Sequence, residues 1–221
     1  MISQKFEFVK NKIQSALEKS GRDPSSITLI AISKKQSLEK IANLIKCNQL
    51  EFGENQLQEI IDKWPLNSEN RRKVKLHFVG AIQSNKIDSI MNECDVIHSI
   101  DREKTLKKIA RKLQQSKKKV ELFVQVNVGE ESQKAGVLPR NIDEFIKMCS
   151  EDYGLSISGL MCMPPFNRNP EEFFVHTRKI ADRHNLSNLS MGMSNDYETA
   201  IKCGSTHIRL GTALFGERIK D

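Results

Sequence analysis

The stretch VELFVQVNV, residues 120–128, decides the fold class because its β-branched and aromatic residues form a short, continuous strand pattern. A helical pattern over residues 140–149 follows it, after Pro139. Moving outward in both directions, the same order of strand and helix repeats along the chain. Seven further segments have strand character: 28–32, 50–52, 74–79, 95–100, 155–161, 188–191 and 206–210.

Helical patterns separate these strands. Residues 2–17 carry apolar side chains at every third or fourth position, which predicts one more helix before the first strand. Further helices are predicted over 38–45 with Ser37 as N-cap, 54–63, 84–91, 101–113 with Asp101 as N-cap, 170–184, 195–202 and from 212 onward. Eight strands that alternate with helices predict a single (β/α)8 TIM barrel over residues 1–221, with an extra N-terminal helix. A doubly wound open sheet is the alternative, because two of the strand segments are short.

The composition limits the classes of protein to which the chain can belong. The chain has 221 residues, and 35 basic against 28 acidic residues give a net charge of +7. Five cysteines, an odd number without a CxxC pair, predict reduced thiols and neither a disulfide framework nor a metal site. The sequence shows no signal peptide and no run of roughly 18 apolar residues, so we expect a cytoplasmic protein without membrane contact.

The positive charge permits binding to nucleic acid, anionic lipid or phosphorylated small molecules without selecting among them. A basic run extends from Lys107 to Lys119. We interpret it as the solvated face of a helix, because aromatic side chains for base stacking are missing there. Nucleic-acid binding remains the less favoured alternative.

In a barrel of this type, functional residues lie after the carboxyl ends of the strands. Lys34 follows the strand 28–32, where loss of hydration lowers a lysine pKa and favours the neutral amine. A neutral amine can form a Schiff base with an aldehyde. The alternative is an ordinary surface lysine. Lys35 is adjacent but is expected to point the other way.

Two glycine-containing turns follow the last two strands. They lie within SMGMSND, residues 190–196, and IRLGTALFG, residues 208–216. Backbone N–H groups at a helix start bind phosphate, and barrels often use this position for it. The sequence therefore predicts a phosphate site beside a candidate Schiff-base lysine.

Several longer motifs occur in a fixed order. They are AISK (31–34), FGENQLQE (52–59), LHFVGAIQSNK (76–86), HSIDR (98–102), FVQVNVGEESQKAGV (123–137), ISGLMCM (157–163), LSMGMSNDYETAI (189–201) and IRLGTALFGER (208–218). In these motifs the chain resembles the pyridoxal phosphate homeostasis protein family, which is related to the N-terminal barrel domain of alanine racemase.

The resemblance implies that pyridoxal 5′-phosphate is bound as an aldimine on Lys34. It implies that Arg209 faces the pyridine nitrogen and that Asn55 and His77 line the ring side of the cofactor. The phosphate would lie at the remaining matched residues, which are Met193, Ser194, Gly211 and Thr212.

A guanidinium can only donate hydrogen bonds, so a ring nitrogen facing Arg209 stays unprotonated and withdraws electrons poorly. We therefore predict a non-catalytic protein of cofactor and amino-acid homeostasis, without catalytic residues. It would be a monomer whose partners include apo forms of pyridoxal phosphate enzymes. The alternative is an amino-acid racemase. Tyr153 and Tyr197, the two tyrosines of the chain, are poorly placed for the second base that racemisation needs.

Overall fold

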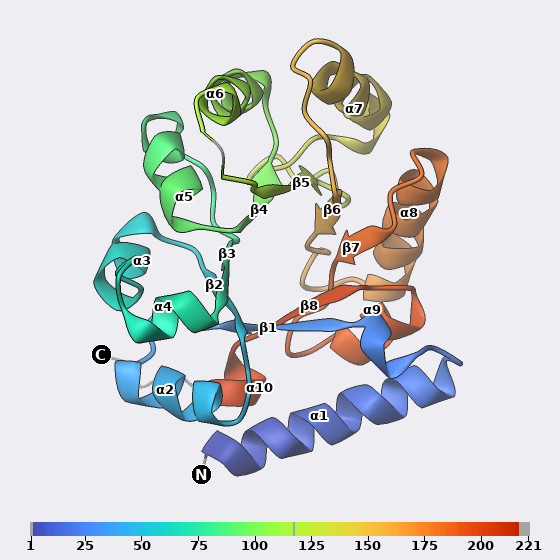
Figure 1. Ribbon diagram of the computed structural model, residues 1–221. Coiled ribbons are helices and arrows are strands. Elements are labelled where there is room, and N and C mark those ends of the chain that lie inside the picture. Colours follow the sequence, from blue (N-terminus) through green and yellow to red (C-terminus); the bar gives the residue numbers. More distant parts are fainter. Residues whose placement is uncertain (1, 117, 217–221) are drawn as a thin grey trace.

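The computed structural model describes residues 2–116 and 118–216, which contain eight parallel strands closed into a barrel (Figure 1). The strands are β1 Thr28–Ile32, β2 Glu51–Glu54, β3 Lys75–Phe78, β4 Val96–Ile100, β5 Glu121–Val126, β6 Gly159–Cys162, β7 Asn188–Ser190 and β8 His207–Leu210. Each strand pairs with its sequence neighbour, and β8 pairs with β1 to close the ring. The predicted (β/α)8 barrel is confirmed, and the open sheet is wrong.

Helices surround the barrel (Figure 1). They are α1 Ile2–Lys19, α2 Leu38–Lys46, α3 Leu57–Lys63, α4 Glu69–Lys73, α5 Ile87–Glu93, α6 Glu103–Gln114, α7 Ile142–Glu151, α8 Pro170–Arg183, α9 Tyr197–Lys202 and α10 Thr212–Phe215. The extra helix α1 lies across the outside and packs against α2, α9 and α10. Its buried face includes Phe6, Val9 and Ile13, as the spacing predicts.

Two of the boundaries that differ from the prediction are the starts of β6 and α6. The strand β6 begins at Gly159, whereas strand character was predicted from Leu155. The N–H of Leu155 instead donates to the Cys149 carbonyl at the end of α7. The predicted cap Asp101 is also wrong, since Arg102 occupies the N-cap position of α6 without a side-chain cap bond.

The region around β2 departs further. The strand extends to Glu54, whose buried side chain accepts a hydrogen bond from the Ser33 hydroxyl, and α3 begins only at Leu57. Sequence reasoning also missed α4. Its signal is Ser68, whose hydroxyl accepts a hydrogen bond from the Arg71 N–H as an N-cap.

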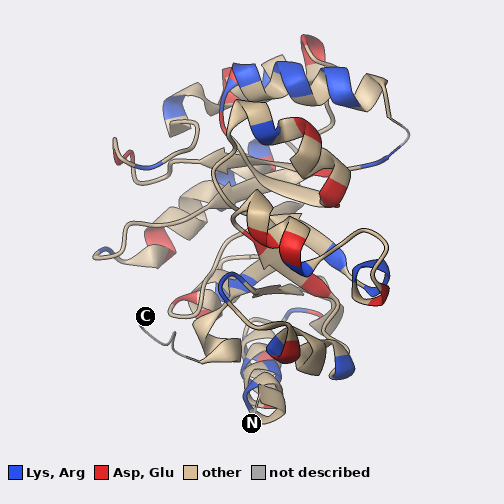
Figure 2. Cartoon of the chain, turned by 90° about the vertical axis from the view of Figure 1, so that its left-hand side faces the viewer, with Lys and Arg blue, Asp and Glu red and all other residues tan. Residues whose placement is uncertain are grey.

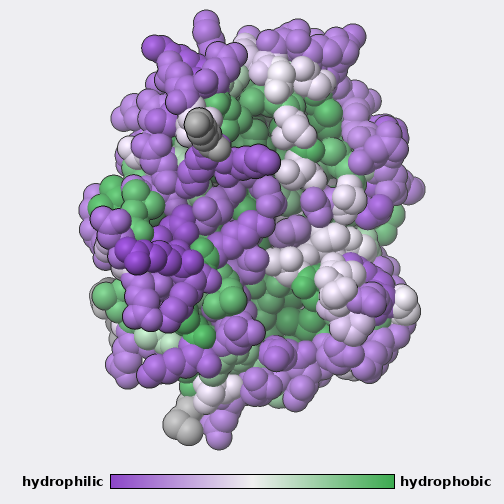
Figure 3. Space-filling view, in the orientation of Figure 1, coloured by the Kyte–Doolittle hydropathy of each residue, from purple (hydrophilic) through white to green (hydrophobic). Residues whose placement is uncertain are grey.

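Two regions of the molecule are packed differently. The shell, which we define as the layer between strands and helices, is a continuous apolar core that includes Leu106, Phe174 and Leu189. The barrel interior, enclosed by the strands, holds a small apolar cluster of Val96, Phe123 and Met161. Beside this cluster lie the buried polar residues His77, His98, Ser190, His207 and Arg209. Figure 3 shows mostly hydrophilic residues around the rim of one face, with hydrophobic patches inside this rim.

Surface charge is concentrated on some helices. Lysine and arginine residues recur along α6 and colour its ribbon blue at the top of Figure 2. Lys117, near the end of the predicted basic run, lies outside the described residues. Within the described part of the chain, no helix combines the length and apolar character needed to cross a membrane.

Candidate functional site

Lys34 lies in the turn that directly follows β1, one residue beyond Ser33. This turn is tied to the next strand and helix. The Ser33 N–H donates to the Gly53 carbonyl at 3.0 Å, and the Ser33 hydroxyl donates to Glu54 Oε1 at 2.7 Å. From α3, Lys63 Nζ donates to the Ser33 carbonyl at 2.7 Å. The backbone before Lys34 is therefore fixed by three hydrogen bonds.

The two adjacent lysines have different environments. Lys34 is half-buried, whereas Lys35 is exposed and takes a left-handed conformation with φ of 58°. The Lys35 N–H donates to Glu59 Oε2 at 2.6 Å, which holds this conformation. Burial alone would raise the pKa of Glu59. Hydrogen bonds from Lys63 and the Lys35 N–H, with the positive charges of Lys63 and Lys34, lower the pKa below its ordinary value.

Sequence reasoning missed the residues that support this turn. Glu54, Glu59 and Lys63 form a cluster in which Lys63 contacts both carboxylates. The signal for part of it is the spacing of Glu59 and Lys63, four residues apart within a predicted helix. Burial raises the pKa of Glu54, although Ser33 and Lys63 oppose this shift.

The two glycine turns that follow β7 and β8 lie in contact. The Ser194 hydroxyl accepts a hydrogen bond from the Ala213 N–H at 3.3 Å. Within the part of the chain that the structure describes, the N–H groups of Ser194, Asn195 and Thr212 make no hydrogen bond. Such N–H groups beside one another can bind an anion. The N–H of Met193 is already used, because Asp196 Oδ1 accepts from it at 2.6 Å.

Gly192 is required by the backbone of the first turn. Its φ is +100°, a backbone conformation that residues with a side chain rarely adopt. A Cβ atom there would lie 2.6 Å from the Cβ of Ala200 in α9. Gly211, in the second turn, has space for a Cβ atom, and its carbonyl accepts from Leu214 and Phe215 at the start of α10.

Arg209 lies in the barrel interior. Its Nη1 donates to Ser190 Oγ at 2.7 Å and its Nη2 donates to the Cys162 carbonyl at 3.0 Å. Burial lowers the pKa of Arg209 from its ordinary value, against the electrostatic effect of Cys162 and Asp196. The guanidinium is thus held by neutral oxygen atoms.

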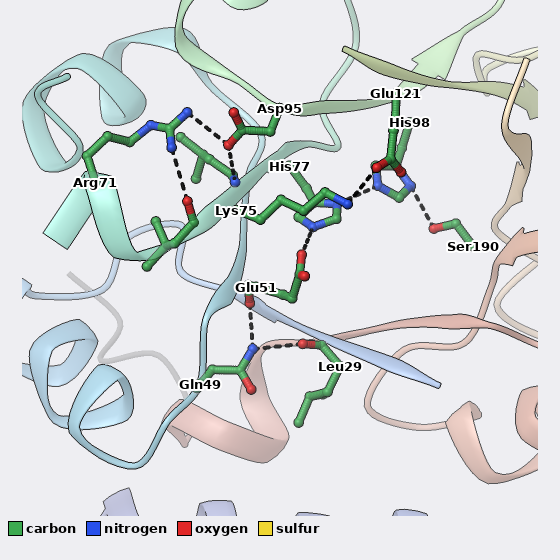
Figure 4. Close-up of polar contacts among 12 residues, drawn as sticks. Leu29, Gln49, Glu51, Arg71, Lys75, His77, Asp95, His98, Glu121 and Ser190 are labelled. Carbon is green, nitrogen blue, oxygen red and sulfur yellow. Dashed lines mark hydrogen bonds and ion pairs between the residues drawn. The ribbon is translucent and has the colours of Figure 1, made fainter. Parts of the chain in front are cut away.

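His77 is fully buried and has both ring nitrogens occupied. Nδ1 lies 2.8 Å from His98 Nε2, and Nε2 lies 2.5 Å from Glu51 Oε2 (Figure 4). The structure therefore places the His77 hydrogen bonds toward the interior and toward Glu51, the first residue of β2.

Asn55 follows β2 and sits tightly against the loop after β3. A Cβ atom on Gly80 would lie 2.0 Å from the Asn55 carbonyl oxygen, so this approach requires glycine. Among the described residues, none pairs with the buried Asn55 Oδ1. An unpaired buried amide oxygen has capacity for a hydrogen bond from a bound molecule.

Most of the predicted residues lie at or just after the carboxyl ends of neighbouring strands. Lys34 follows β1, Asn55 follows β2, and the two turns follow β7 and β8. Arg209 and His77 lie within β8 and β3. In the described residues, no group of three or more histidine, cysteine or acidic side chains is arranged to hold a metal ion.

The chain is similar to known proteins over most of its length. The family model for the alanine racemase N-terminal domain matches residues 14–219. A pyridoxal phosphate homeostasis protein of Aquifex aeolicus is 34% identical over 219 residues, covering 95% of this chain and 95% of that protein. The protein of the same description from Escherichia coli strain K12 is 33% identical, covering 95% and 94% of the two chains.

Solved structures show the same fold. PipY of Synechococcus elongatus with PLP bound has a TM-score of 0.83 and 28% identity, covering 98% of this chain and 100% of that chain. An alanine racemase of Clostridium difficile has a TM-score of 0.70 and 14% identity, and the match covers 99% of this chain and 58% of that chain. At that identity, the racemase supports the fold alone.

Proposed function

The chain belongs to the pyridoxal phosphate homeostasis protein family, within the alanine racemase N-terminal domain family, and from this premise we propose that it binds pyridoxal 5′-phosphate as a Schiff base on Lys34. The protein acts in homeostasis of this cofactor and of amino acids without catalysing a reaction itself. PipY, which is similar over its full length, has been solved with PLP bound.

The observation that carries the proposal is the meeting of the two turns beside the β1 turn. Their N–H groups at Ser194, Asn195 and Thr212 make no hydrogen bonds within the described chain, which fits a phosphate dianion. The unpaired oxygen of Asn55 fits a polar group on the pyridine ring. The residues present therefore suit the cofactor, whose aldehyde forms a covalent bond with a lysine amine when bound.

Lys34 is the amine that we assign to this bond. It is half-buried, and the turn before it is fixed by β2 and α3. The Glu59 carboxylate, which fixes the Lys35 N–H, also interacts electrostatically with Lys34. Arg209 would donate to the ring nitrogen, and Met193, Gly211 and Thr212 would shape the phosphate end. Asn55 and His77 would line the ring side of the cofactor.

Two features support a role without catalysis. Arg209 cannot give a proton to the ring nitrogen, so the electron-withdrawing power of the ring stays low. Neither tyrosine is available as a second base. The Tyr153 hydroxyl donates to Glu103 on the outer helix α6, and the Tyr197 ring belongs to the apolar core of the shell.

Borohydride reduction of protein incubated with pyridoxal phosphate tests the linkage. We expect a pyridoxyl group on the peptide that contains Lys34, located by mass spectrometry. Lys34→Ala removes it, whereas the matched control Lys35→Ala retains it. Reduced protein without a pyridoxyl group on Lys34 would disprove the proposal.

Racemase activity is the competing function. Incubation of the loaded protein with L-alanine, followed by chiral chromatography, is expected to give no D-alanine above the level of free cofactor. Turnover that disappears in Lys34→Ala would establish an enzyme and overturn the non-catalytic role.

The remaining parts of the proposal concern assembly and exchange. Residues 1–221 act as one domain, in a cytoplasmic monomer that passes the cofactor to apo forms of pyridoxal phosphate enzymes and binds no nucleic acid. Light scattering measures the mass in solution, and reactivation of an apo-enzyme by loaded protein measures transfer. A dimer mass, or reactivation no faster than with free cofactor, contradicts the corresponding part.

A further inference from the structure

A chain of hydrogen-bonded polar side chains crosses the barrel interior from Glu51 to Arg209. Glu51 Oε2 lies 2.5 Å from His77 Nε2, and His77 Nδ1 lies 2.8 Å from His98 Nε2. His98 Nδ1 lies 2.8 Å from Ser190 Oγ, which accepts from Arg209 Nη1 at 2.7 Å. Figure 4 shows the part of this hydrogen-bonded chain from Glu51 to Ser190. We call these five residues the interior relay.

The interior relay connects the two ends of the barrel. Glu51 is the first residue of β2, so it stands at the amino end, where its side chain is 31% exposed. His77, His98 and Ser190 are fully buried on β3, β4 and β7. Arg209 is the third residue of β8 and lies next to the cofactor site after β7 and β8. A carboxylate that water reaches is thereby joined to a buried cation.

Hydrogen-bond chemistry determines where each proton lies. Arg209 can only donate, so Ser190 Oγ accepts from it. The Ser190 hydroxyl then donates to His98 Nδ1, the other group that contacts it within the described chain. His98 therefore carries its proton on Nε2 and donates to His77 Nδ1. By the same argument, His77 carries its proton on Nε2 and donates to the Glu51 carboxylate.

The opposite arrangement leaves a buried donor without an acceptor. If His98 carried its proton on Nδ1, Ser190 would accept two hydrogen bonds, and its own proton would have no partner among the described residues. Such a group costs free energy in a buried site. The interior relay is therefore polarised in one direction, from Arg209 to Glu51.

Burial and the charges around His98 favour its neutral form. Burial lowers the pKa of His98 well below its ordinary value, and His77, Arg209, His207 and Lys75 lower it further. His77 faces the carboxylate of Glu51 on β2. The groups that face His77 from β3, β4 and β8 are positive or neutral hydrogen-bond donors. Lys75, the positive group on β3, is itself paired with Glu121 on β5. The cation at the buried end of the relay is thus Arg209, and its hydrogen-bonded link to a carboxylate runs through two neutral rings.

We propose that Glu51, His77, His98 and Ser190 are positioning residues that fix the orientation and hydrogen-bond direction of Arg209. A change at Glu51, at the amino end of the barrel, then alters the surroundings of the pyridine ring bound at the carboxyl end. This consequence for the ring rests on the proposed cofactor binding, whereas the arrangement of protons does not.

The proton arrangement is tested on the full chain without cofactor. Nitrogen-15 NMR of the histidine rings at pH 7.5 is expected to show His77 and His98 as neutral rings, each with its proton on Nε2. Replacing each histidine in turn by glutamine assigns the signals. A proton on Nδ1 of either ring, or a doubly protonated His98, overturns the relay even if the protein binds pyridoxal phosphate.

The link to the site is tested on protein loaded with pyridoxal phosphate. Glu51→Met removes the final acceptor, so we expect a shifted absorption band with a changed pH profile and a severalfold faster loss of cofactor. Glu51→Gln keeps an acceptor oxygen and is expected to restore most of the wild-type spectrum. The matched control is Glu121→Met, also the first residue of a strand at the amino end but outside the relay.

The outcomes separate the two proposals. If Glu51→Met has the spectrum, pH profile and cofactor loss of wild type, the relay does not position Arg209 and the inference is overturned. If wild type itself binds no cofactor, the proposed function fails, and the NMR result alone decides the relay. Should Glu51→Met not fold, Glu51→Ala compared with Glu121→Ala gives the same decision, because alanine also removes the final acceptor of the relay.

Discussion

The shell and the barrel interior are built from the same strands, yet they serve different purposes. In the shell, apolar side chains from strands meet apolar helix faces, and Leu106 and Phe174 are fully buried there. In the interior, His98 stacks on Phe123 with ring centroids 4.5 Å apart and contacts Ser190 and His77. Alternate residues of one strand therefore contribute either to stability or to the polar site.

This difference teaches that burial alone does not identify the role of a strand residue. Leu122 and Phe123 are adjacent in β5 and both are buried, but Leu122 belongs to the shell core and Phe123 to the interior cluster. Side chains alternate across a strand, so the direction of each one decides which region it enters. Substitutions in the two regions should have separable effects.

The largest effect is expected in the shell. Leu106→Ala in α6 removes a fully buried side chain and should lower the free energy of unfolding by about 2–5 kcal/mol, because a cavity remains. The absorption spectrum of bound pyridoxal phosphate should be unchanged, since α6 faces away from the interior. Denaturant unfolding and a visible spectrum measure both.

The control for this prediction is Leu38→Ala in α2, a leucine that is 56% exposed. It should change stability little, because exposed surface residues contribute little packing. A large spectral change in Leu106→Ala would show that the shell and the interior are coupled, and would contradict the expectation that their substitutions have separable effects.

The shell is also the region that sequence patterns predicted best. Helical spacing in residues 2–17 and the strand pattern of residues 120–128 depend on neighbours within one segment, and both elements are present. Errors occurred where a distant group decides a boundary. The start of β6 depends on the carbonyl of Cys149, and the end of β2 depends on the burial of Glu54 behind Ser33.

A smaller effect, from the interior, is a loss of stability in acid. Burial lowers the pKa of His98 well below its ordinary value of 6.5, and it lowers that of His207 to about 4. Below pH 6.5 the unfolded chain binds protons that the folded chain does not. Stability is therefore present in full above this pH and decreases as the pH falls, by about 2 kcal/mol for His207 between pH 6.5 and 5, and His98 acts in the same direction.

The measurement is the free energy of unfolding at a series of pH values. The free energy of unfolding of His207→Gln should fall less steeply below pH 6.5 than that of wild type. The control His176→Gln, at an exposed position, should give the wild-type slope. An equal slope in His207→Gln and wild type would mean that His207 does not stay neutral in the folded interior.

The site was predicted in part, for a physical reason. Lys34 and the two turns stand out because Lys34 follows an apolar strand and the turns combine glycine with hydroxyl groups. The interior relay joins Glu51, His98 and Ser190 from three strands far apart in the sequence. Each of these residues has an ordinary setting in its own segment, so their meeting follows only from barrel closure.

The smallest effect is expected where the interior meets the surface, at the joined turns. Ser194→Ala removes the acceptor for the Ala213 N–H, and one hydrogen bond of this kind contributes about 1 kcal/mol to stability. Cofactor affinity should fall by more than stability does if, as we propose, the hydroxyl also donates to a charged phosphate oxygen. Urea unfolding and a fluorescence titration with pyridoxal phosphate measure the two quantities. Thr199→Ala, in α9 beyond the same turn, is the matched control and should leave the titration unchanged. Equal losses of affinity in both variants would place the effect in the general stability of this segment, and would remove Ser194 from the phosphate site.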